Sequence, residues 1–351
     1  MNSNASMFTC PVLSSDDQER ITLAHGEGAR LTRELIQRRI LPLFLNEPLA
    51  SLGDAARLAP VSGPLAFSSD SFVVSPLFFP GGDIGKLSIY GTTNDLAVAG
   101  AEPLWMSLSL IIEEGLPFAT LDRVLQSAAD AARSVGVSVV TGDTKVVPRG
   151  AADGLFITTS GIGYYPDDQT YDCRQIQPGD CLIVTGDIAR HGMSILAARE
   201  SLGIVSEIQS DCDSLLPAVR RLREAAIPIR AMRDATRGGV AAVLHEWSLA
   251  CGHTLTVTEQ RVPVRPQVRG ICELLGLDPL FVANEGTMIV AVPETAVGRA
   301  IETLRQSAAT SQAVEIGRVG RRKLAPVTVI RSLGREIPLD EPSGAFLPRI
   351  C

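Results

Sequence analysis

Apolar residues recur along this chain in two different patterns, which alternate from one end to the other. Helical spacing and composition predict helices over residues 31–43, 85–100, 121–135, 191–202, 213–225, 240–250 and 295–306. Short apolar runs predict strands over 65–70, 72–74, 104–112, 137–140, 155–162, 181–185, 254–258 and 287–292, with three short strands before the C-terminal tail. Because the two kinds of element alternate, the chain is expected to have an α/β (α+β) fold.

The length of the chain, 351 residues, favours two domains over one. We expect a disordered arm over 1–20, an N-terminal domain over 21–165, a C-terminal α/β domain over 166–338 and a flexible tail over 339–351. The tripeptide Thr-Gly-Asp at 141–143 recurs at 185–187, which hints at two similar halves. The N-terminal stretch has no basic-then-apolar pattern, and no run approaches eighteen apolar residues, so we expect neither a secretory signal nor a membrane span.

Charge and cysteine usage narrow the class of protein further. The formal net charge of −7 disfavours nucleic acid and anionic membranes as partners. The cysteines at positions 10, 173, 181, 212, 251, 272 and 351 form no CxxC pair and no zinc-finger spacing with histidine. We therefore expect reduced, mostly buried thiols in a cytoplasmic protein.

The last eleven residues, Glu341 to Cys351, end on a thiol beside the chain's own α-carboxylate. Two prolines and a glycine disfavour a helix or a central strand here, so the stretch is expected to be an extended, movable tail. The residues leave three interpretations open: an accidental cysteine on a frayed terminus, a swinging nucleophile, or a ligand offered to a partner. Prenylation is excluded, because its motif has the cysteine fourth from the end.

A glycine-bearing loop precedes the first predicted helix. Gly26 and Gly28 would be able to present backbone N–H groups to a phosphate. The loop matches neither GxGxxG nor GxxxxGK[ST], and Glu27 and Arg30 suit a solvated loop equally well. Phosphate contact and a plain loop therefore both remain open.

Four aspartates lie at predicted element ends or beside glycine and threonine: Asp70, Asp95, Asp143 and Asp234. Mg²⁺ prefers carboxylate oxygens, usually one or two together with substrate phosphates. Asp143 and Lys145 follow a buried-type strand, at the end where α/β proteins place their sites. Four converging carboxylates would repel one another unless a cation neutralised them, so the set suits Mg²⁺-dependent phosphoryl transfer without a P-loop.

These positions also have interpretations that involve no ligand. Asn94 and Asp95 lie in a stretch of small residues, where a solvated helix face is the more frequent explanation. Asp234 and Thr236 precede a predicted helix and would suit its N-cap. Glu285 sits in a turn just before a strand, from which it reaches either a cleft or solvent.

Several strings resemble the hydrogenase maturation proteins of the HypE family, in the superfamily of aminoimidazole ribonucleotide synthetase and selenophosphate synthetase. They are SSDSFVVSPLFFPGGDIGKLSIYGTTNDLAVAGA, IIEEGLPF, VTGDTKVVPRG, RDATRGGV, ANEG and the terminal PRIC, which is highly specific to this family. The resemblance covers roughly residues 21–351. It implies a two-domain fold of the aminoimidazole ribonucleotide synthetase type, with N-terminal sheets that pair in a homodimer.

The resemblance implies an ATP- and Mg²⁺-dependent carbamoyl dehydratase that supplies the cyanide ligands of nickel–iron hydrogenases. In this family HypF transfers a carbamoyl group to the C-terminal cysteine. ATP then activates the amide oxygen, loss of water gives a thiocyanate, and the nitrile passes to iron held by a HypC–HypD complex.

Carried over position by position, the resemblance gives each candidate residue a role. Cys351 would carry the substrate, Glu285 would be the base, and Lys145 would relay a proton or stabilise charge. The nucleotide would contact Asp70, Asn94, Asp95, Asp143, Asp234, Thr236, Arg237 and Gly238. Mg²⁺ would bind Asp70, Asp95, Asp143 and Asp234, with Asp54 as a weaker match.

One stretch departs from the family pattern of a histidine followed by glycines, since it reads His25-Gly-Glu-Gly-Ala29. Glu27 adds negative charge and Ala29 restricts the backbone, which weakens the case for phosphate binding there. Two other functions stay open beside the dehydratase. One is another ATP-dependent synthetase or kinase of the superfamily that acts on a free small molecule. The other is a non-catalytic docking protein whose tail recruits partners.

Overall fold

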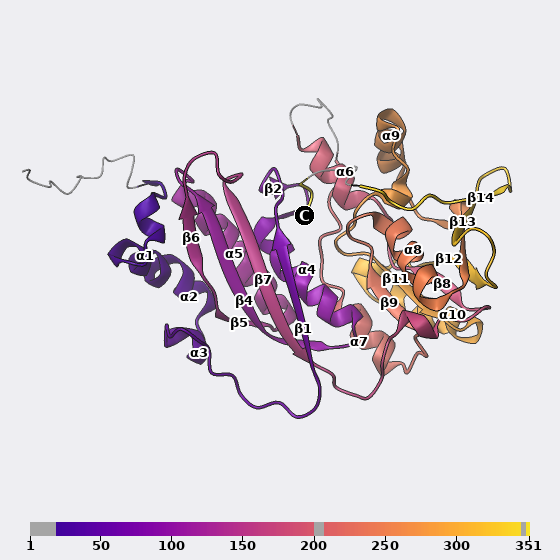
Figure 1. The fold of residues 1–351 in the computed structure, drawn as a ribbon, viewed down its shortest axis with the longest axis horizontal. Helices are drawn as coiled ribbons and strands as arrows, with labels where there is room; N and C mark the ends of the chain where they lie inside the picture. Colours follow the sequence, from indigo (N-terminus) through magenta and orange to yellow (C-terminus); the bar gives the residue numbers. More distant parts are fainter. Residues whose placement is uncertain (1–18, 200–206, 345–348) are drawn as a thin grey trace, which may run out of the picture.

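The computed structural model describes residues 19–199, 207–344 and 349–351, which form two lobes side by side (Figure 1). Residues 1–18 of the arm expected over 1–20, with Cys10, and the end of the helix expected over 191–202 lie outside the described residues. Arg20, the last residue of that expected arm, forms an isolated bridge with Pro117. Among the helices of the described ranges, none combines the length and the apolar character needed to cross a membrane.

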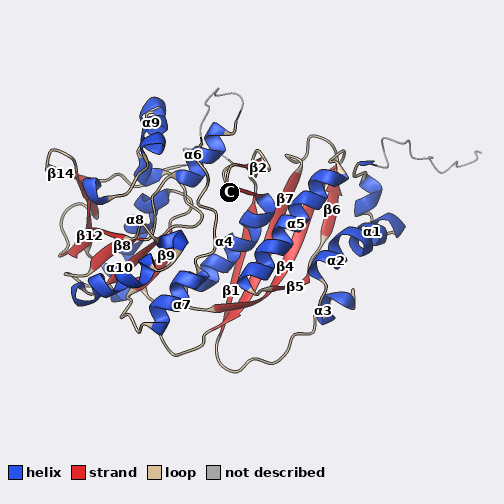
Figure 2. Ribbon diagram, turned by 180° about the vertical axis from the view of Figure 1, so that it is seen from behind, coloured by secondary structure: helices blue, strands red, loops and turns tan. Residues whose placement is uncertain are grey.

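The N-terminal lobe is a five-stranded sheet with helices on one face. Its strands are β1 (Leu65–Phe72), β4 (Glu102–Glu113), β5 (Ser138–Thr141), β6 (Thr144–Val147) and β7 (Leu155–Tyr164). A separate two-stranded hairpin consists of β2 (Phe78–Phe79) and β3 (Gly82–Asp83). Its helices are α1 (Arg30–Leu35), α2 (Leu41–Phe44), α3 (Glu47–Ala50), α4 (Ile84–Val98) and α5 (Phe118–Val135). The strand order is β1-β7-β4-β5, and β6 continues beside β4. Helices α4 and α5 cover one face (Figure 2).

The alternation of side chains along the strands produces one covered and one open face. In β7 every second residue is buried, and Thr159 faces α4, where its hydroxyl lies 2.6 Å from that of Thr92. The opposite face carries no helix in Figure 1. It presents Leu65, Phe67 and Ile111, whose side chains are 55 %, 70 % and 39 % exposed. An open sheet face with large apolar side chains is a candidate interface.

Helix α4 is covered on nearly all sides, so the solvated face expected around Asn94 and Asp95 is wrong. The sheet, α5 and the other lobe surround it, and most of its residues are buried. Small residues permit this close approach: a Cβ at Gly85 would lie 2.2 Å from the carbonyl oxygen of Val124 in α5. Asn94 is fully buried and Asp95 is half-buried.

The sheet edge beside β4 is interrupted between β5 and β6. A Cβ at Gly142 would lie 2.0 Å from the carbonyl oxygen of Leu108, so only glycine fits at the break. The Asp143 carbonyl then accepts a hydrogen bond from the Leu110 N–H at 2.8 Å, and the chain resumes pairing. Asp143 and Lys145 follow the end of β5, as expected, and Lys145 also lies within a further strand, β6.

The C-terminal lobe contains a seven-stranded sheet in the order β14-β13-β10-β12-β8-β11-β9. Its strands are β8 (Cys181–Val184), β9 (Ala231–Asp234), β10 (Thr254–Thr258), β11 (Met288–Val292), β12 (Val314–Gly320), β13 (Val327–Ile330) and β14 (Glu336–Pro338). Its helices are α6 (Arg190–Ala197), α7 (Leu216–Glu224), α8 (Gly239–Cys251), α9 (Pro266–Leu275) and α10 (Val297–Arg305). The apolar pattern missed β6, β9 and α9, which are short or contain glycine.

One hydrophobic cluster joins the lobes. It contains residues of α4 and α5 together with Leu215, Val219 and Met288 of the C-terminal lobe. At the junction, the Glu102 carboxylate forms ion pairs with Arg220 at 2.6 Å and Arg223 at 2.5 Å. The C-terminal end of the chain lies between the two lobes, beside the ends of β1 and α6 (Figure 1).

Candidate active site

The C-terminal cysteine lies in a small polar cavity between the lobes. The cavity measures about 40 Å³, which leaves room for roughly one water molecule and none for a nucleotide. Its walls are formed by Asp70, Ser71, Phe72, Gly91, Asp95, Asp234, Thr236, Arg237, Glu285 and Cys351. Most of the predicted site residues therefore meet at the end of the tail.

Three elements bring carboxylates to this cavity. Asp70 lies in β1 and accepts a hydrogen bond from the Thr92 hydroxyl of α4 at 3.1 Å. Asp95 lies in α4 and accepts one from the Ser68 hydroxyl of β1 at 2.7 Å. Asp234 ends β9 in the other lobe and is buried. The site is thus assembled across the junction of the lobes.

The segment after β9 does not cap the following helix, so the capping interpretation of Asp234 and Thr236 is wrong. The N-cap of α8 is Gly238, and no side chain caps this helix. Gly238 and Gly239 have φ of 76° and 61°, a left-handed conformation that favours glycine. Thr236 and Arg237 are left to line the cavity.

Burial and mutual repulsion raise the pKa values of two aspartates of the cavity. Burial, followed by the charges of Asp234 and Asp70, raises the pKa of Asp95 to about 7. Burial raises the pKa of Asp234 to about 6, with Arg233 opposing. The positive charges of Arg233 and Arg237 offset only part of this effect, and a divalent cation would supply more.

The carboxylates fit Mg²⁺ that arrives with a nucleotide better than a preformed metal centre. In the described part of the chain, no group of three or more histidine, cysteine, aspartate and glutamate side chains is arranged to hold a metal ion. Mg²⁺ usually takes only one or two carboxylates and completes its shell with water and phosphate oxygens. Asp70, Asp95 and Asp234 are the cavity aspartates from which one or two such ligands would come.

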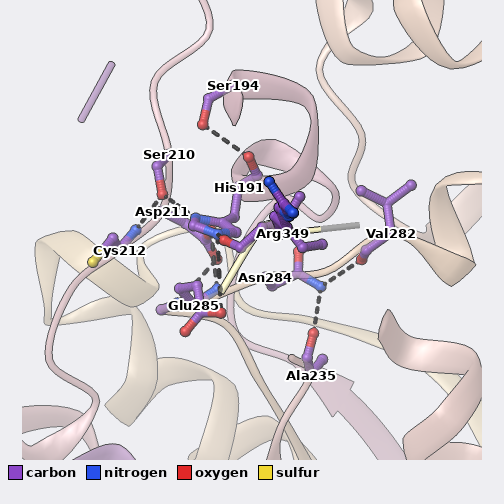
Figure 3. Close-up of polar contacts among 12 residues, drawn as sticks. His191, Ser194, Ser210, Asp211, Cys212, Ala235, Val282, Asn284, Glu285 and Arg349 are labelled. Atoms are coloured by element: carbon purple, nitrogen blue, oxygen red, sulfur yellow. Dashed lines mark hydrogen bonds and ion pairs between the residues drawn. The ribbon is translucent and has the colours of Figure 1, made fainter. Parts of the chain in front are cut away.

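Glu285 is 3 % exposed, so the solvated turn considered for it is wrong. The Asp211 carboxylate holds this turn. It accepts hydrogen bonds from the N–H groups of Glu285 at 3.2 Å and Gly286 at 3.1 Å, and from the Thr287 hydroxyl at 2.8 Å. Figure 3 shows Asp211 beside Glu285. A Cβ at Gly286 would lie 1.9 Å from the Asp211 carbonyl oxygen, which explains the glycine.

The Glu285 carboxylate is poised to hold or accept a proton. Burial, followed by the charges of Asp234, Asp211 and Asp70, raises its pKa well above the usual range, and Arg237 opposes the shift. Its Oε1 is buried and has no hydrogen-bond partner among the described residues. A raised pKa and an unused acceptor atom are properties expected of a general base.

Asn94 supports Glu285 from behind. Its Nδ2 donates to the carbonyl oxygens of Asp213 at 3.0 Å and Glu285 at 3.1 Å, and its Oδ1 accepts from the Leu215 N–H at 2.8 Å. The side chain is 0 % exposed. Asn284 holds the same turn from the other side, through carbonyl groups of Ala235 and Val282 (Figure 3).

The Cys351 thiol and the Glu285 carboxylate line the same cavity. Burial, followed by the charge of Glu285, raises the pKa of Cys351 to about 12, with Arg237 opposing. The docked sulfur is therefore a protonated thiol at neutral pH. Because the thiolate is the reactive form, the docked position does not suit nucleophilic attack.

Asp143 and Lys145 line a second, larger pocket in the N-terminal lobe. This pocket measures about 360 Å³, lies between α1–α3 and the edge formed by β5 and β6, and includes Gly26 and Gly28 in its wall. Its volume is within the range of small-molecule sites. The Lys145 Nζ is 3.8 Å from the Asp143 carboxylate, and both side chains are 64 % exposed.

The glycine loop meets this second pocket with its backbone. The Gly28 N–H donates to the Thr32 hydroxyl at 3.0 Å, so this group is already used within the protein. A Cβ at Gly26 would lie 2.5 Å from the Val146 nitrogen, which shows how closely the loop packs on β6. Glu27 and Ala29 are exposed and belong to neither lining.

The structure thus divides the predicted residues between two places. Asp143 and Lys145 lie in the larger pocket, Asp54 is exposed outside both, and Gly238 adjoins the cavity. Sequence reasoning missed Asp211 and His191. The polar run Ser-Asp-Cys-Asp at 210–213, just before a predicted helix, was the only pattern that pointed toward Asp211.

Comparisons with known proteins agree over most of the chain. Residues 53–165 and 177–329 match the N-terminal and C-terminal domains of the AIR synthase related protein family. The chain is 46 % identical to carbamoyl dehydratase HypE of Escherichia coli K12, over 94 % of this chain and 99 % of that protein. A crystal structure of HypE with ATP has a TM-score of 0.90 and 42 % identity, over 94 % and 99 % of the two chains. A HypE–HypF complex has a TM-score of 0.77 and 40 % identity, over 88 % and 99 %.

Proposed function

The chain belongs to the HypE family of carbamoyl dehydratases, and from this premise we propose that Cys351 carries the group on which the enzyme acts. The protein is an ATP-dependent carbamoyl dehydratase that takes part in hydrogenase maturation. The resemblance and the two-domain α/β fold expected from the sequence are both confirmed. The observation that supports the role of Cys351 is the position of its thiol, which lines one small cavity together with the buried Glu285 carboxylate and the aspartates Asp70, Asp95 and Asp234.

The reaction converts an S-carbamoyl group into a thiocyanate. The amide oxygen attacks the terminal phosphorus of ATP, so an O–P bond forms, the bond to ADP breaks and one N–H proton is lost. The C–O bond then breaks and phosphate leaves with the electron pair. Loss of the second N–H proton completes the C≡N bond. Phosphorylation is needed because an amide oxygen is a poor leaving group, and a base is needed for the protons.

We assign the base to Glu285. Its carboxylate lines the same cavity as the Cys351 thiol, and burial raises its proton affinity toward that of the group it deprotonates. The positive charge of Arg237 acts on both Glu285 and Cys351, because it opposes the rise of both pKa values. Its position suits a negatively charged phosphoryl group beside the amide.

We assign Asp70, Asp95 and Asp234 to Mg²⁺ and the phosphates, with Thr236 alongside. Bound Mg²⁺ supplies positive charge to carboxylates that otherwise repel one another. Asp143 lies across two intervening strands from Asp70, which corresponds to roughly 14 Å at about 4.8 Å per strand. We therefore place the nucleoside end in the larger pocket, near Asp143 and Lys145, with the triphosphate directed toward Cys351.

The tail has to leave the cavity before it can be loaded. The docked thiol is protonated, and the remaining space of about 40 Å³ does not admit a carbamoyl donor. We propose that HypF loads the withdrawn tail, in line with the HypE–HypF complex of a close relative. The nitrile would pass, again from a withdrawn tail, to iron held by a HypC–HypD complex. A cytoplasmic location belongs to this proposal, because Cys351 must stay reduced.

We also propose a homodimer through the open face of the N-terminal sheet. Phe67 is 70 % exposed there and lies opposite Ile162 in the strand register, within an apolar area. Burying such an area is favourable, so Phe67→Glu is expected to turn a sedimenting dimer into a monomer. A wild-type monomer at micromolar concentration would contradict this part.

Intact-protein mass spectrometry with HypF, carbamoyl phosphate and ATP tests the main proposal. We expect a carbamoyl adduct on the C-terminal peptide, followed by loss of one water only when Mg²⁺ and ATP are present. Cys351→Ala is expected to abolish both species. If this variant still accumulates either adduct, the tail is not the carrier. A kinase acting on a free substrate would tolerate the substitution.

A further inference from the structure

The residue before Cys351 is held by a contact that none of the assignments above uses. The Ile350 carbonyl oxygen lies 2.5 Å from Nε2 of His191, the second residue of α6. Both residues are buried, with His191 at 0 % and Ile350 at 6 % exposure. The imidazole also lies edge-on against Phe79, with ring centroids 5.4 Å apart. The polar contact to the tail is thus made in a fully desolvated place.

The hydrogen-bond partners determine which nitrogen of His191 carries the proton. A carbonyl oxygen only accepts, so Nε2 must donate to Ile350. Burial lowers the pKa of His191, so the ring is neutral and Nδ1 is an acceptor. The Ser210 hydroxyl, 2.8 Å away, donates to Nδ1, while its oxygen accepts from the Cys212 N–H at 3.0 Å. The donors form one directed chain that ends on the tail.

The same loop also positions the base. Asp211 lies between Ser210 and Cys212, and its carboxylate holds the Glu285 turn. The His191 Nε2 is 4.0 Å from Glu285 Oε1. One short segment therefore orients both the group that holds the tail and the group that faces the sulfur (Figure 3).

We infer that His191 is a positioning residue: its Nε2–H holds the Ile350 carbonyl and thereby sets the Cys351 sulfur beside Glu285, and loss of this contact releases the tail for loading. The inference rests on the proposed role of Cys351 as carrier. His191 touches neither the sulfur nor the reacting amide, so it acts through the geometry of the tail.

The other polar contacts of the tail end lie nearer the surface, while the Ile350 side chain packs in the hydrophobic cluster that joins the lobes. The Arg349 carbonyl accepts from the Ser75 N–H at 3.2 Å and from an Arg199 guanidinium nitrogen at 3.0 Å, and the Arg349 side chain pairs with Asp153. The Arg349 side chain is 58 % exposed, and exposed ion pairs contribute little. Among the hydrogen bonds described for the tail end, the one to His191 is therefore the most deeply buried, and it fixes the direction in which the packed end points.

A second histidine marks where the releasable segment begins. His245 of α8 lies with Nε2 3.1 Å from the Leu339 carbonyl oxygen, and Leu339 is 4 % exposed. Twelve residues follow Leu339, and such a chain reaches at most about 40 Å when fully extended. Release at His191 alone, with His245 still in place, would let the thiol travel this far toward a partner.

The test compares two substitutions of His191, to Asn and to Gln, each of which places a polar atom near only one of the two imidazole nitrogens. Asn retains an acceptor near the place of Nδ1 but has no donor at Nε2, whereas Gln retains a donor near Nε2. We expect His191→Asn to raise the rate of Cys351 alkylation by iodoacetamide about tenfold, since one buried hydrogen bond is lost. His191→Gln should stay within about twofold of wild type. Peptide mass spectrometry after timed quenching gives the rate at each cysteine.

The buried cysteines serve as internal controls for folding. Cys181, Cys212 and Cys272 are buried and should stay unlabelled in every variant. If His191→Asn labels them too, the fold is lost, and Ser210→Ala takes its place. That variant removes the donor to Nδ1 and should raise Cys351 labelling about threefold. Unchanged Cys351 labelling in the folded variants would overturn the inference.

The rates of carbamoylation and of dehydration give an independent test, because we expect His191→Asn to affect the two steps differently. His191→Asn is expected to be carbamoylated by HypF at least as fast as wild type, because its tail is free more often. Its carbamoylated form should lose water about tenfold more slowly, and His191→Gln should restore the rate. Failure of the carrier proposal would instead show as adduct on Cys351→Ala, whatever His191 does. Equal slowing of both steps would also overturn the inference.

Discussion

The cavity around Cys351 and the pocket around Asp143 use the same residue types in opposite ways. In the cavity, Asp95 and Glu285 are withdrawn from water, and their pKa values rise until protons compete with cations for them. In the pocket, Asp143 and Lys145 are 64 % exposed, and their 3.8 Å contact is largely screened by water. Burial turns carboxylates into proton acceptors, whereas exposure leaves them as recognition groups.

The two aspartates of the repeated tripeptide Thr-Gly-Asp also differ in exposure. In the first copy, Asp143 is exposed at a break in the sheet edge. In the second, the Asp187 carboxylate forms ion pairs with Arg190 and Arg265 and is 10 % exposed. Identical local sequences thus lie in the wall of an open pocket in one lobe and in an internal ion-pair network in the other. The following predictions test this contrast between buried and exposed carboxylates.

The largest effect is expected at the base. Glu285→Gln cannot take up a proton, so dehydration of the carbamoylated protein should fall by roughly 10²–10⁴-fold, while carbamoylation by HypF continues. Single-turnover mass spectrometry measures both steps. Glu27→Gln, at an exposed position of the glycine loop, is the matched control and should react like wild type. Dehydration at the normal rate in Glu285→Gln would place the base elsewhere.

Asn94→Ala should lower the stability of the fold, because Asn94 bridges the two lobes behind the cavity. The substitution leaves the Leu215 N–H and the carbonyl groups of Asp213 and Glu285 without their partner. The free energy of unfolding in urea should fall by roughly 2–4 kcal/mol. Gln126→Ala, on the exposed side of α5, should stay within about 0.5 kcal/mol of wild type. A loss as small as that of the control would show that the bridge is dispensable.

Asp95→Asn should stabilise the metal-free protein in a pH-dependent way. The pKa of Asp95 is raised from 3.8 to about 7, so the folded state binds the proton more tightly than the unfolded state. Ionisation therefore opposes folding progressively from about pH 4 to about pH 7, and fully above that. We expect a gain on the order of 2 kcal/mol at pH 8 that shrinks toward pH 5. Thermal unfolding without Mg²⁺ measures this, and an equal gain at both pH values would contradict it.

The smallest effect is expected on the affinity for Mg²⁺-ATP, which tests the cavity and the pocket separately. Asp234→Asn in the cavity and Asp143→Asn in the pocket should each weaken Mg²⁺-ATP binding about tenfold, or about 1.4 kcal/mol, without loss of the fold. Titration calorimetry measures the affinity, with Cys351→Ala as a control that binds normally. If only Asp234→Asn binds more weakly, the pocket does not contribute to the nucleotide site. Unchanged binding in both variants would reject the assignment of both aspartates.

Local spacing in the sequence determined the elements and marked most of the chemistry. Helix α5 was predicted because its apolar residues recur at helical intervals and Gly136 ends it in a left-handed conformation. Strand β7 was predicted from a short apolar run, and its side chains alternate between the two faces of the sheet. The strings around Asp70, Asp143, Asp234 and Glu285 indicated the family without any knowledge of the fold. These features depend on neighbours a few residues away, which the sequence displays directly.

Only the tertiary structure decided which of these residues meet and which are withdrawn from water. Asn94 and Glu285 looked equally suited to solvent in the sequence, yet contacts between residues 191 positions apart bury both. His191 and Ile350 are 159 positions apart, and no motif links them. A contact of this kind arises when two lobes pack and a tail enters between them. Its partners are set by the shape of the whole molecule, which residue spacing does not encode.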